Sequence, residues 1–265
     1  MAVIPVYGEG RPSHVAVGDG LKMAREQVEF ADPATMPWEP AAIPGFPDGT
    51  REKVLSEDAE SGASTRVLTV PPGESGDPAA LDDEVEIFVV AGSLRIDARR
   101  LNEYDYAFLP AGAEAAFGTA DRCRLLYMPS GPVETGDATD AAPEPLSVGE
   151  MDWEQPQTEG FPAGAARKSL HYDEDTGAAT WLLGVLPAWR ETRIEVHPVV
   201  EEGYQVQGSM ESDQGTFSAG KYFWRPPGIP HGPFETAEGC LTFFRTNGEL
   251  ETDYLGDTAD SEFLK

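Results

Sequence analysis

The segment from Glu195 to His231 contains the side chains of this sequence that are best suited to bind a metal ion. Glu195, His197 and Glu201 lie close together, and His231 follows further along the chain. Alternate side chains of a strand share a face, so Glu195 and His197 would point the same way, and a turn would return Glu201 toward them. Two imidazoles and a carboxylate are the arrangement of non-haem Fe(II) oxygenases, which keep open positions for substrate and dioxygen. The pattern therefore indicates metal chemistry.

The residues before and after His231 follow a recognisable spacing. Gly220, Pro226, Gly228 and His231 fit the pattern Gly-x5-Pro-x-Gly-x2-His, and Glu235 stands where an asparagine usually follows. This segment resembles the second motif of the cupin superfamily. The resemblance implies a small β-barrel whose metal ligands point inward.

The preceding segment resembles the first cupin motif. His197, Glu201 and Gly208 occupy motif positions, whereas Glu195 stands where the family usually has its first metal-binding histidine. The motifs are also similar to those of ChrR-like and acetylacetone-dioxygenase-like cupins. The resemblance implies that His197, Glu201 and His231 hold one divalent metal ion. Fe(II) is the favoured ion, and Mn(II), Zn(II) and Ni(II) stay open.

Two points about the ligands stay open at this stage. Glu195 either joins as a further ligand, which would favour Mn(II) or Fe(II), or it hydrogen-bonds a ligand imidazole or pairs with Arg193. Glu201 competes with its neighbour Glu202, because Tyr204 shares the alternation phase of Glu202 and could place that carboxylate inward. The motif spacing favours Glu201.

Further side chains are expected to act around the ion. Arg193 would steady an enolate or a carboxylate, and Glu195 or Tyr204 would move a proton. Ligand pockets are mostly apolar with a few placed polar groups. The predicted lining consists of Arg193, Tyr204, Tyr222, Trp224 and Phe244.

An internal repeat organises the chain. Met36–Glu39 (MPWE) recurs as Met151–Glu154 (MDWE), and similar matches continue along both copies. Each copy alternates short segments rich in β-branched and aromatic residues with Gly/Pro turns, which is typical of strands. We therefore predict an all-β fold of two tandem cupin (double-stranded β-helix, jelly-roll) domains. The expected parts are an N-terminal arm (1–35), a first cupin domain (36–130), a linker (131–150) and a metal-binding cupin domain (151–265).

The first copy has different residues at the ligand positions. Leu81, Ala115 and either Val85 or Glu86 align with the three expected ligands. We therefore predict a degenerate domain without a metal site, whose role is structural or dimerising. Upstream, residues 21–30 fit either an amphipathic helix or a strand.

Composition limits the partners of the protein. The formal net charge of −28 disfavours nucleic acid and anionic membrane surfaces, because both attract basic proteins. The N-terminus lacks the features of a secretory signal, and no apolar run approaches the roughly 18–20 residues that span a bilayer, so we expect a cytoplasmic protein. The two cysteines are too few for a disulfide framework. Exposed strand edges need covering, which favours a homodimer.

The resemblance implies a mononuclear Fe(II) dioxygenase that acts on a small organic molecule such as a diketone, a hydroxyketone or a phenolic compound. Metal-dependent isomerase or lyase chemistry, in which the ion polarises a carbonyl group, is the alternative enzyme class. A Zn-binding, ChrR-like sensor or binding module is the non-enzymatic alternative.

Overall fold

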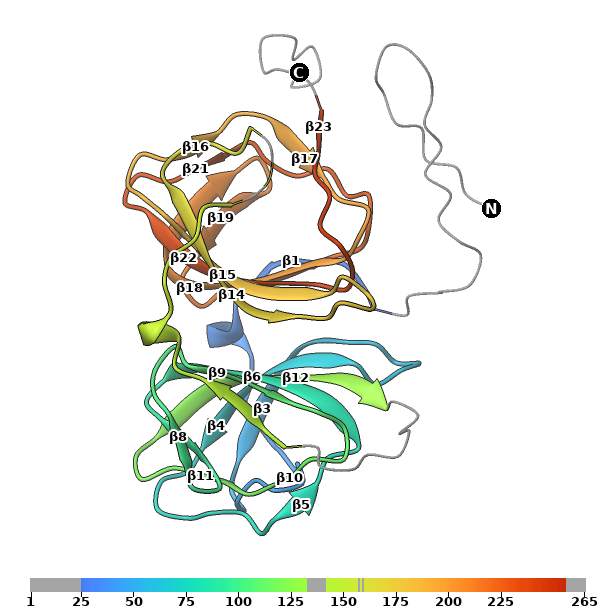
Figure 1. Ribbon diagram of the computed structural model, residues 1–265, viewed down its shortest axis with the longest axis vertical. Coiled ribbons are helices and arrows are strands. Elements are labelled where there is room, and N and C mark those ends of the chain that lie inside the picture. The colour runs from blue at the N-terminus through green and yellow to red at the C-terminus, as the bar shows by residue number, and fades with distance from the viewer. Residues whose placement is uncertain (1–24, 133–141, 157, 159, 256–265) are drawn as a thin grey trace. The chain divides into compact units, whose positions relative to one another are not determined.

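The computed structural model describes residues 25–132, 142–156, 158 and 160–255 (Figure 1). These residues form antiparallel β-strands and two short 3-10 helices, η1 (Pro33–Thr35) and η2 (Val148–Glu150). The predicted all-β fold is confirmed. Within the described ranges, no helix has the length and apolarity needed to cross a membrane.

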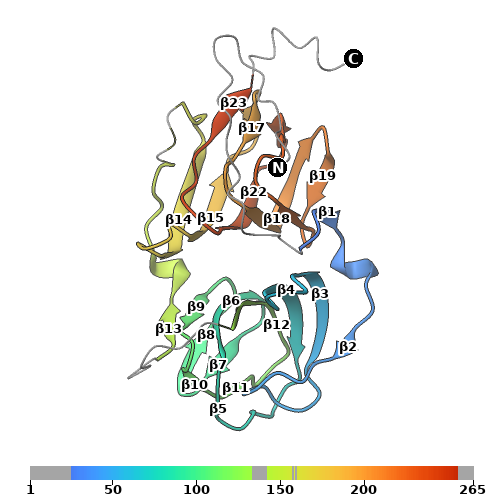
Figure 2. The same cartoon turned by 90° about the vertical axis from the view of Figure 1, so that its right-hand side faces the viewer.

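The described chain divides into two compact units. The first unit consists of residues 25–26, 31–132 and 142–152, and the second consists of residues 27–30, 153–156, 158 and 160–255. In each unit a large antiparallel sheet is accompanied by smaller strand pairs, and the strands curve around an interior (Figure 2).

The first unit contains a seven-stranded sheet in the order β13-β9-β6-β12-β4-β3-β2. Strands β11-β7-β8 form a second sheet, and β10 pairs with β5. Apolar side chains of the large sheet, such as Leu68, Ile87 and Leu125, are fully buried. The strands are β2 (Glu39–Pro40), β3 (Arg51–Glu57), β4 (Ser64–Val70), β5 (Ala79–Ala80), β6 (Asp83–Ala91), β7 (Leu94–Ile96), β8 (Arg99–Leu101), β9 (Tyr106–Leu109), β10 (Glu114–Ala115), β11 (Phe117–Gly118), β12 (Cys123–Pro132) and β13 (Glu144–Leu146).

The second unit is built on a sheet whose main path runs β1-β20-β18-β22-β15-β14. Strands β19 and β21 pair with β18, β16 pairs with β21, and β17 pairs with β23. The strands are β1 (Val28–Ala31), β14 (Ala165–Tyr172), β15 (Ala179–Val185), β16 (Arg190–Glu191), β17 (Ile194–Val196), β18 (Glu201–Ser212), β19 (Gly215–Ser218), β20 (Tyr222–Arg225), β21 (Phe234–Glu235), β22 (Cys240–Thr246) and β23 (Asp253–Leu255).

Two segments differ from the predicted division of the chain. Val28–Ala31, within the predicted arm, is strand β1 and extends the sheet of the second unit. Glu144–Leu146, within the predicted linker, is strand β13 and pairs with β9 of the first unit. Both segments gain partners for their backbone N–H and C=O groups by joining a sheet edge. The rest of the arm (1–24) and the centre of the linker (133–141) lie outside the described residues.

The repeat seen in the sequence is matched by a repeated side-chain contact. The Tyr106 hydroxyl donates to the Glu86 carboxylate at 2.6 Å, and the Tyr222 hydroxyl donates to Glu202 at 2.5 Å. Both members of the second pair lie 116 residues after those of the first (202 − 86 and 222 − 106). The contact therefore aligns the two units residue by residue.

Replacing Tyr106 by Phe removes the hydroxyl that donates to the buried Glu86. Loss of such a hydrogen bond costs about 1–3 kcal/mol, so we expect the free energy of unfolding in urea to fall by that amount. Tyr172→Phe changes an exposed tyrosine of β14 and is the matched control, with an expected change below about 0.5 kcal/mol. An unchanged transition for Tyr106→Phe would contradict this role of the pair.

Candidate metal centre

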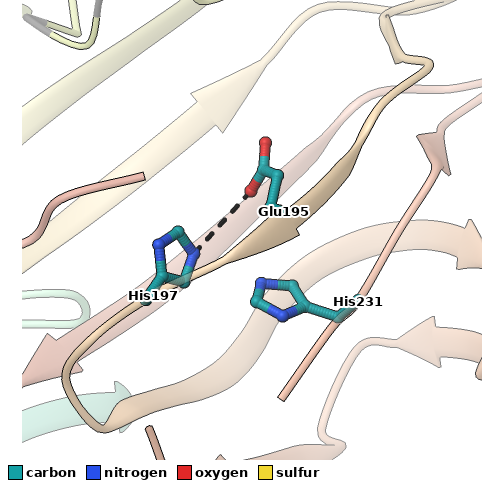
Figure 3. A group of neighbouring side chains, drawn as sticks. All are labelled: Glu195, His197 and His231. Carbon is teal, nitrogen blue, oxygen red and sulfur yellow. Dashed lines mark ion pairs between the residues drawn. The ribbon is translucent and has the colours of Figure 1, made fainter. Parts of the chain in front are cut away.

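Strand β17 and the segment that leads to His231 position the first three residues of the site. Glu195 lies on β17 and His197 follows the strand, so alternation directs both side chains to one side (Figure 3). The Glu195 N–H donates to the His231 carbonyl at 2.8 Å, and the His231 N–H donates to the Glu195 carbonyl at 3.0 Å. This antiparallel bridge places His231 beside the other two residues.

The side chains of Glu195, His197 and His231 converge and are buried. One potential ligand atom of each lies within 4.8 Å of the others. The Glu195 Oε2 atom is 3.8 Å from His197 Nε2, and the two imidazole centroids are 5.0 Å apart. Donor atoms this close together can reach one common ion.

Backbone carbonyl groups orient both imidazoles. His197 Nδ1 is 3.0 Å from the Glu251 carbonyl oxygen, and His231 Nδ1 is 2.8 Å from that of Ile229. A carbonyl oxygen only accepts, so each Nδ1 carries the proton and each Nε2 keeps its lone pair. The His231 Nε2 atom is buried and makes no hydrogen bond among the described residues, while the Glu201 Oε2 atom lies 3.2 Å from it. Both rings thus have the tautomer that a metal ligand requires.

Glu201, at the start of β18, also reaches the two imidazoles. Its Oε1 atom is 3.9 Å from His197 Nε2, and its Oε2 atom is 3.2 Å from His231 Nε2. Glu202 points to the other face of the strand, where it accepts hydrogen bonds from Tyr222 and Arg245. Glu201 is therefore the residue of the pair that faces the site.

The site concentrates negative charge in a buried place. Burial raises the pKa of Glu195 to about 8, and the neighbouring carboxylates of Glu201 and Glu191 act in the same direction. Burial would raise the pKa of Glu201 as well, but the two site histidines and Arg225 outweigh it and lower this pKa. Burial lowers the pKa of His231, while the Glu201 carboxylate acts in the opposite direction. A divalent cation would offset the charge of the two buried carboxylates and could accept the Nε2 lone pairs of the imidazoles, so these residues fit a metal ion.

Comparison with protein-family models identifies the family of the chain. The model of the family described as "Domain of unknown function (DUF4437)" matches residues 42–253, which is most of the chain. The chain belongs to the DUF4437 family. No curated protein sequence matches it significantly.

Solved structures similar to this DUF4437 protein share the cupin fold. A candidate dioxygenase from Nostoc punctiforme is 24% identical with a TM-score of 0.76, covering 90% of this chain and 89% of that chain. A Bacillus subtilis oxalate decarboxylase variant is 12% identical, with a TM-score of 0.58 and coverage of 85% and 78%. A salicylate 1,2-dioxygenase variant from Pseudoaminobacter salicylatoxidans is 12% identical, with a TM-score of 0.54 and coverage of 74% and 75%. The predicted pair of tandem cupin domains is confirmed at the level of the fold.

Arg225 is a site residue that the sequence reasoning missed. Its Nη1 atom donates to Glu201 at 3.0 Å, while Nε and Nη2 donate to the two carboxylate oxygens of Glu29 at 3.1 and 2.6 Å. Glu29 comes from β1, which pairs with β20, the strand that ends at Arg225. Arg225 immediately precedes the motif residue Pro226, and this position is the sequence signal that could have identified it. No spacing rule pointed to Glu29, 196 residues away.

A mostly apolar cavity lies against this cluster. Glu195, His197, Glu201 and Arg225 line its polar end. Aromatic side chains form much of the remaining wall, among them Phe161, Trp181, Trp189, Phe223 and Phe234. Such a wall suits an apolar ligand and keeps water from the polar end.

The predicted lining differs from the structure at three aromatic positions. Phe244 lines the cavity. Tyr204, Tyr222 and Trp224 are buried, and their strand positions share the alternation phase of Glu202, which faces away from the site. Adjacent side chains of a strand point to opposite faces, so residues in the phase of Glu202 face away from the cavity when Glu201 faces it. Tyr204 therefore does not reach the cavity as a proton-transfer group.

The structure also places Arg193 outside the cavity lining. Its guanidinium donates to both carboxylate oxygens of Glu191, at 2.8 and 2.6 Å, and to the Gly160 carbonyl. It stacks over the ring of Tyr254, 3.4 Å from the centroid. These contacts satisfy Arg193 locally, and its contact with a substrate stays a prediction.

The first unit has apolar residues where the second has its charged cluster. Alignment through the Glu–Tyr pairs, 116 residues apart, matches Val85 with Glu201 and leaves Glu86 as the counterpart of Glu202. Leu81, Val85, Leu109 and Ala115, the counterparts of His197, Glu201, Arg225 and His231, all belong to the hydrophobic core of the first unit. At these four positions the first unit therefore has apolar packing in place of ionisable groups.

Replacing Arg225 by Met removes the cation that lies between Glu29 and Glu201. Breaking a buried ion pair by removing one partner costs about 3–5 kcal/mol, so we expect a loss of this size in the free energy of unfolding of the metal-free protein. Arg190→Met breaks the exposed pair with Glu235 and should cost less than about 1 kcal/mol. Urea denaturation with chelator present measures both. Equal small losses would contradict the role assigned to Arg225.

Proposed function

We propose that this DUF4437 protein is a mononuclear metal-dependent cupin enzyme of the dioxygenase type, with Fe(II) as its ion and a small organic molecule as its substrate. The main support is the pair of imidazoles whose Nε2 lone pairs face two buried carboxylates. The backbone carbonyls that orient both rings, and the buried His231 Nε2 atom beside the Glu201 carboxylate, are consistent with a site that binds a metal ion. The fold likeness to dioxygenases is consistent with this activity.

His197, His231 and Glu201 are the proposed ligands, with Glu195 as a fourth. Imidazole and carboxylate donors suit Fe(II) and Mn(II), and the absence of thiolate among these four disfavours Cu(I). When bound, such an ion would supply a Lewis acid with open positions for substrate and dioxygen. Arg225 offsets the charge of Glu201 and holds it in place.

Glu195 also has the properties of a proton acceptor for the substrate. Its carboxylate is buried and lines the cavity. The structure gives it no hydrogen bond from a basic side chain among the described residues, in contrast to Glu201 with Arg225. A carboxylate in this setting can take a proton from a substrate hydroxyl or from an acidic C–H group.

The first test of the proposal is the metal content of the purified protein. We expect about one Fe or Mn ion per chain after purification without chelator and reconstitution. His231→Ala and His197→Ala should each remove most of that metal, because each deletes one of few ligands. His171→Ala changes a histidine of β14 outside the cavity and should leave the metal content unchanged. Elemental analysis by mass spectrometry measures all four proteins.

Oxygen consumption then tests the reaction class. The Fe(II)-loaded protein should consume dioxygen only when a suitable diketone, hydroxyketone, phenolic compound or organic acid is present, and His231→Ala should not. Stoichiometric zinc without oxygen consumption would contradict the dioxygenase and favour lyase chemistry or a binding role. Failure to bind any metal after reconstitution would contradict the metal site itself.

A further inference from the structure

The cavity contains one charged side chain outside the cluster at its polar end. Arg167 lies on β14 and lines the cavity, as do Leu183 and Thr242, its successive register partners on β15 and β22. Glu195, His197, Glu201 and Arg225 are the other charged or titratable residues among the described lining. Arg167 is thus a lone cation within a wall that is otherwise apolar or neutral.

The side chain of Arg167 is half-buried and has no hydrogen-bond or ion-pair partner among the described residues. Its Nε atom is buried and makes no hydrogen bond. Among the described residues, no carboxylate forms an ion pair with it. By contrast, Arg225 and Arg193 are each held by carboxylates. A buried donor without an acceptor costs about 1–3 kcal/mol, so a structural role alone does not account for this arginine.

The excess of acidic residues in the protein makes the unpaired state of Arg167 unusual. Acidic residues outnumber basic ones by 47 to 19, so unpaired carboxylates are plentiful on this chain. An arginine that nevertheless stays unpaired inside a cavity keeps its charge available for an anionic ligand. The guanidinium presents parallel N–H donors that match a carboxylate in a two-point contact.

We propose that Arg167 binds a carboxylate of the substrate, so that the site takes a small organic acid with an apolar or aromatic body. This inference rests on the proposed function for the reaction, because it names the substrate class of the same cavity. The carboxylate would pair with Arg167 and the body would lie against Trp181, Phe161 and Phe244. The group to be transformed would then face the polar end of the cavity.

Ligand binding is measured through the intrinsic tryptophan fluorescence of the protein, since Trp181 and Trp189 line the cavity. Benzoate and phenylacetate are the probes, and the neutral amide benzamide is their comparison. Metal-free and metal-loaded proteins are both titrated, because a carboxylate can also bind a metal ion. We expect saturable binding of at least one acid by both forms, and binding of benzamide weaker by about tenfold or more.

Arg167→Met should weaken binding of the acid by about tenfold or more and leave benzamide binding unchanged. Arg190→Met removes an exposed arginine of the same unit and should bind both probes as the native protein does. The proposal is overturned if neither acid binds the native protein, or if Arg167→Met binds the acid normally. It is also overturned if acid binding disappears on metal removal, since the carboxylate then goes to the ion.

Thermal unfolding separates a ligand-binding role from a structural one. If Arg167 has no partner in the free protein, Arg167→Met removes an unsatisfied donor and the melting temperature should stay the same or rise. A clear fall in the melting temperature would show a structural partner and contradict the proposal. Metal content is measured on the same samples. Failure of the proposed metal site would appear as a native protein that binds no metal, whereas failure of the Arg167 proposal would appear as normal acid binding or a lower melting temperature in Arg167→Met.

Discussion

The second unit depends on the stable burial of ionisable groups in the interior of a small barrel. An isolated buried charge costs several kcal/mol in effective terms, and partners or a metal ion must offset this cost. Arg225 does so for Glu201, and Glu29 in turn satisfies the remaining guanidinium donors of Arg225. Among the described residues no arginine donates a hydrogen bond to Glu195, and burial raises its pKa. The arrangement is therefore most stable with a cation between the carboxylates and the imidazoles.

This constraint explains why distant segments of the chain contribute to one site. Strand β1 supplies Glu29, and the segment before β23 supplies the Glu251 carbonyl that orients His197. Neither segment provides a proposed metal ligand. The Glu251 carbonyl fixes the proposed ligand His197 directly. Glu29 acts one step further away, because it holds Arg225, which in turn donates to the proposed ligand Glu201. The cupin core alone, without these two segments, would leave His197 and Arg225 without their fixing contacts.

Much of this arrangement was predictable from local spacing, and the rest was not. The motifs predicted that Glu195, His197, Glu201 and His231 lie close together, and the structure places them so, because strand alternation and a short turn decide their positions. The sequence did not decide which face of β18 turns toward the cavity, so Tyr204 was predicted to line it. In the structure Glu201 faces the cavity, and Tyr204 lies in the opposite alternation phase. Contacts such as Glu29 with Arg225 follow from which strand joins which sheet edge, and such long-range pairing leaves no periodic signal in the sequence.

The two copies also separate what the fold needs from what the site needs. The Glu–Tyr hydrogen bond occurs in both units, whereas the inward positions are apolar in the first and ionisable in the second. Leu81 and Val85 fill the first interior by packing alone. The ionisable cluster is therefore not required to close a barrel of this kind. Its presence in the second unit, together with the unpaired Arg167 in the same cavity, is best explained by ligands that arrive after folding.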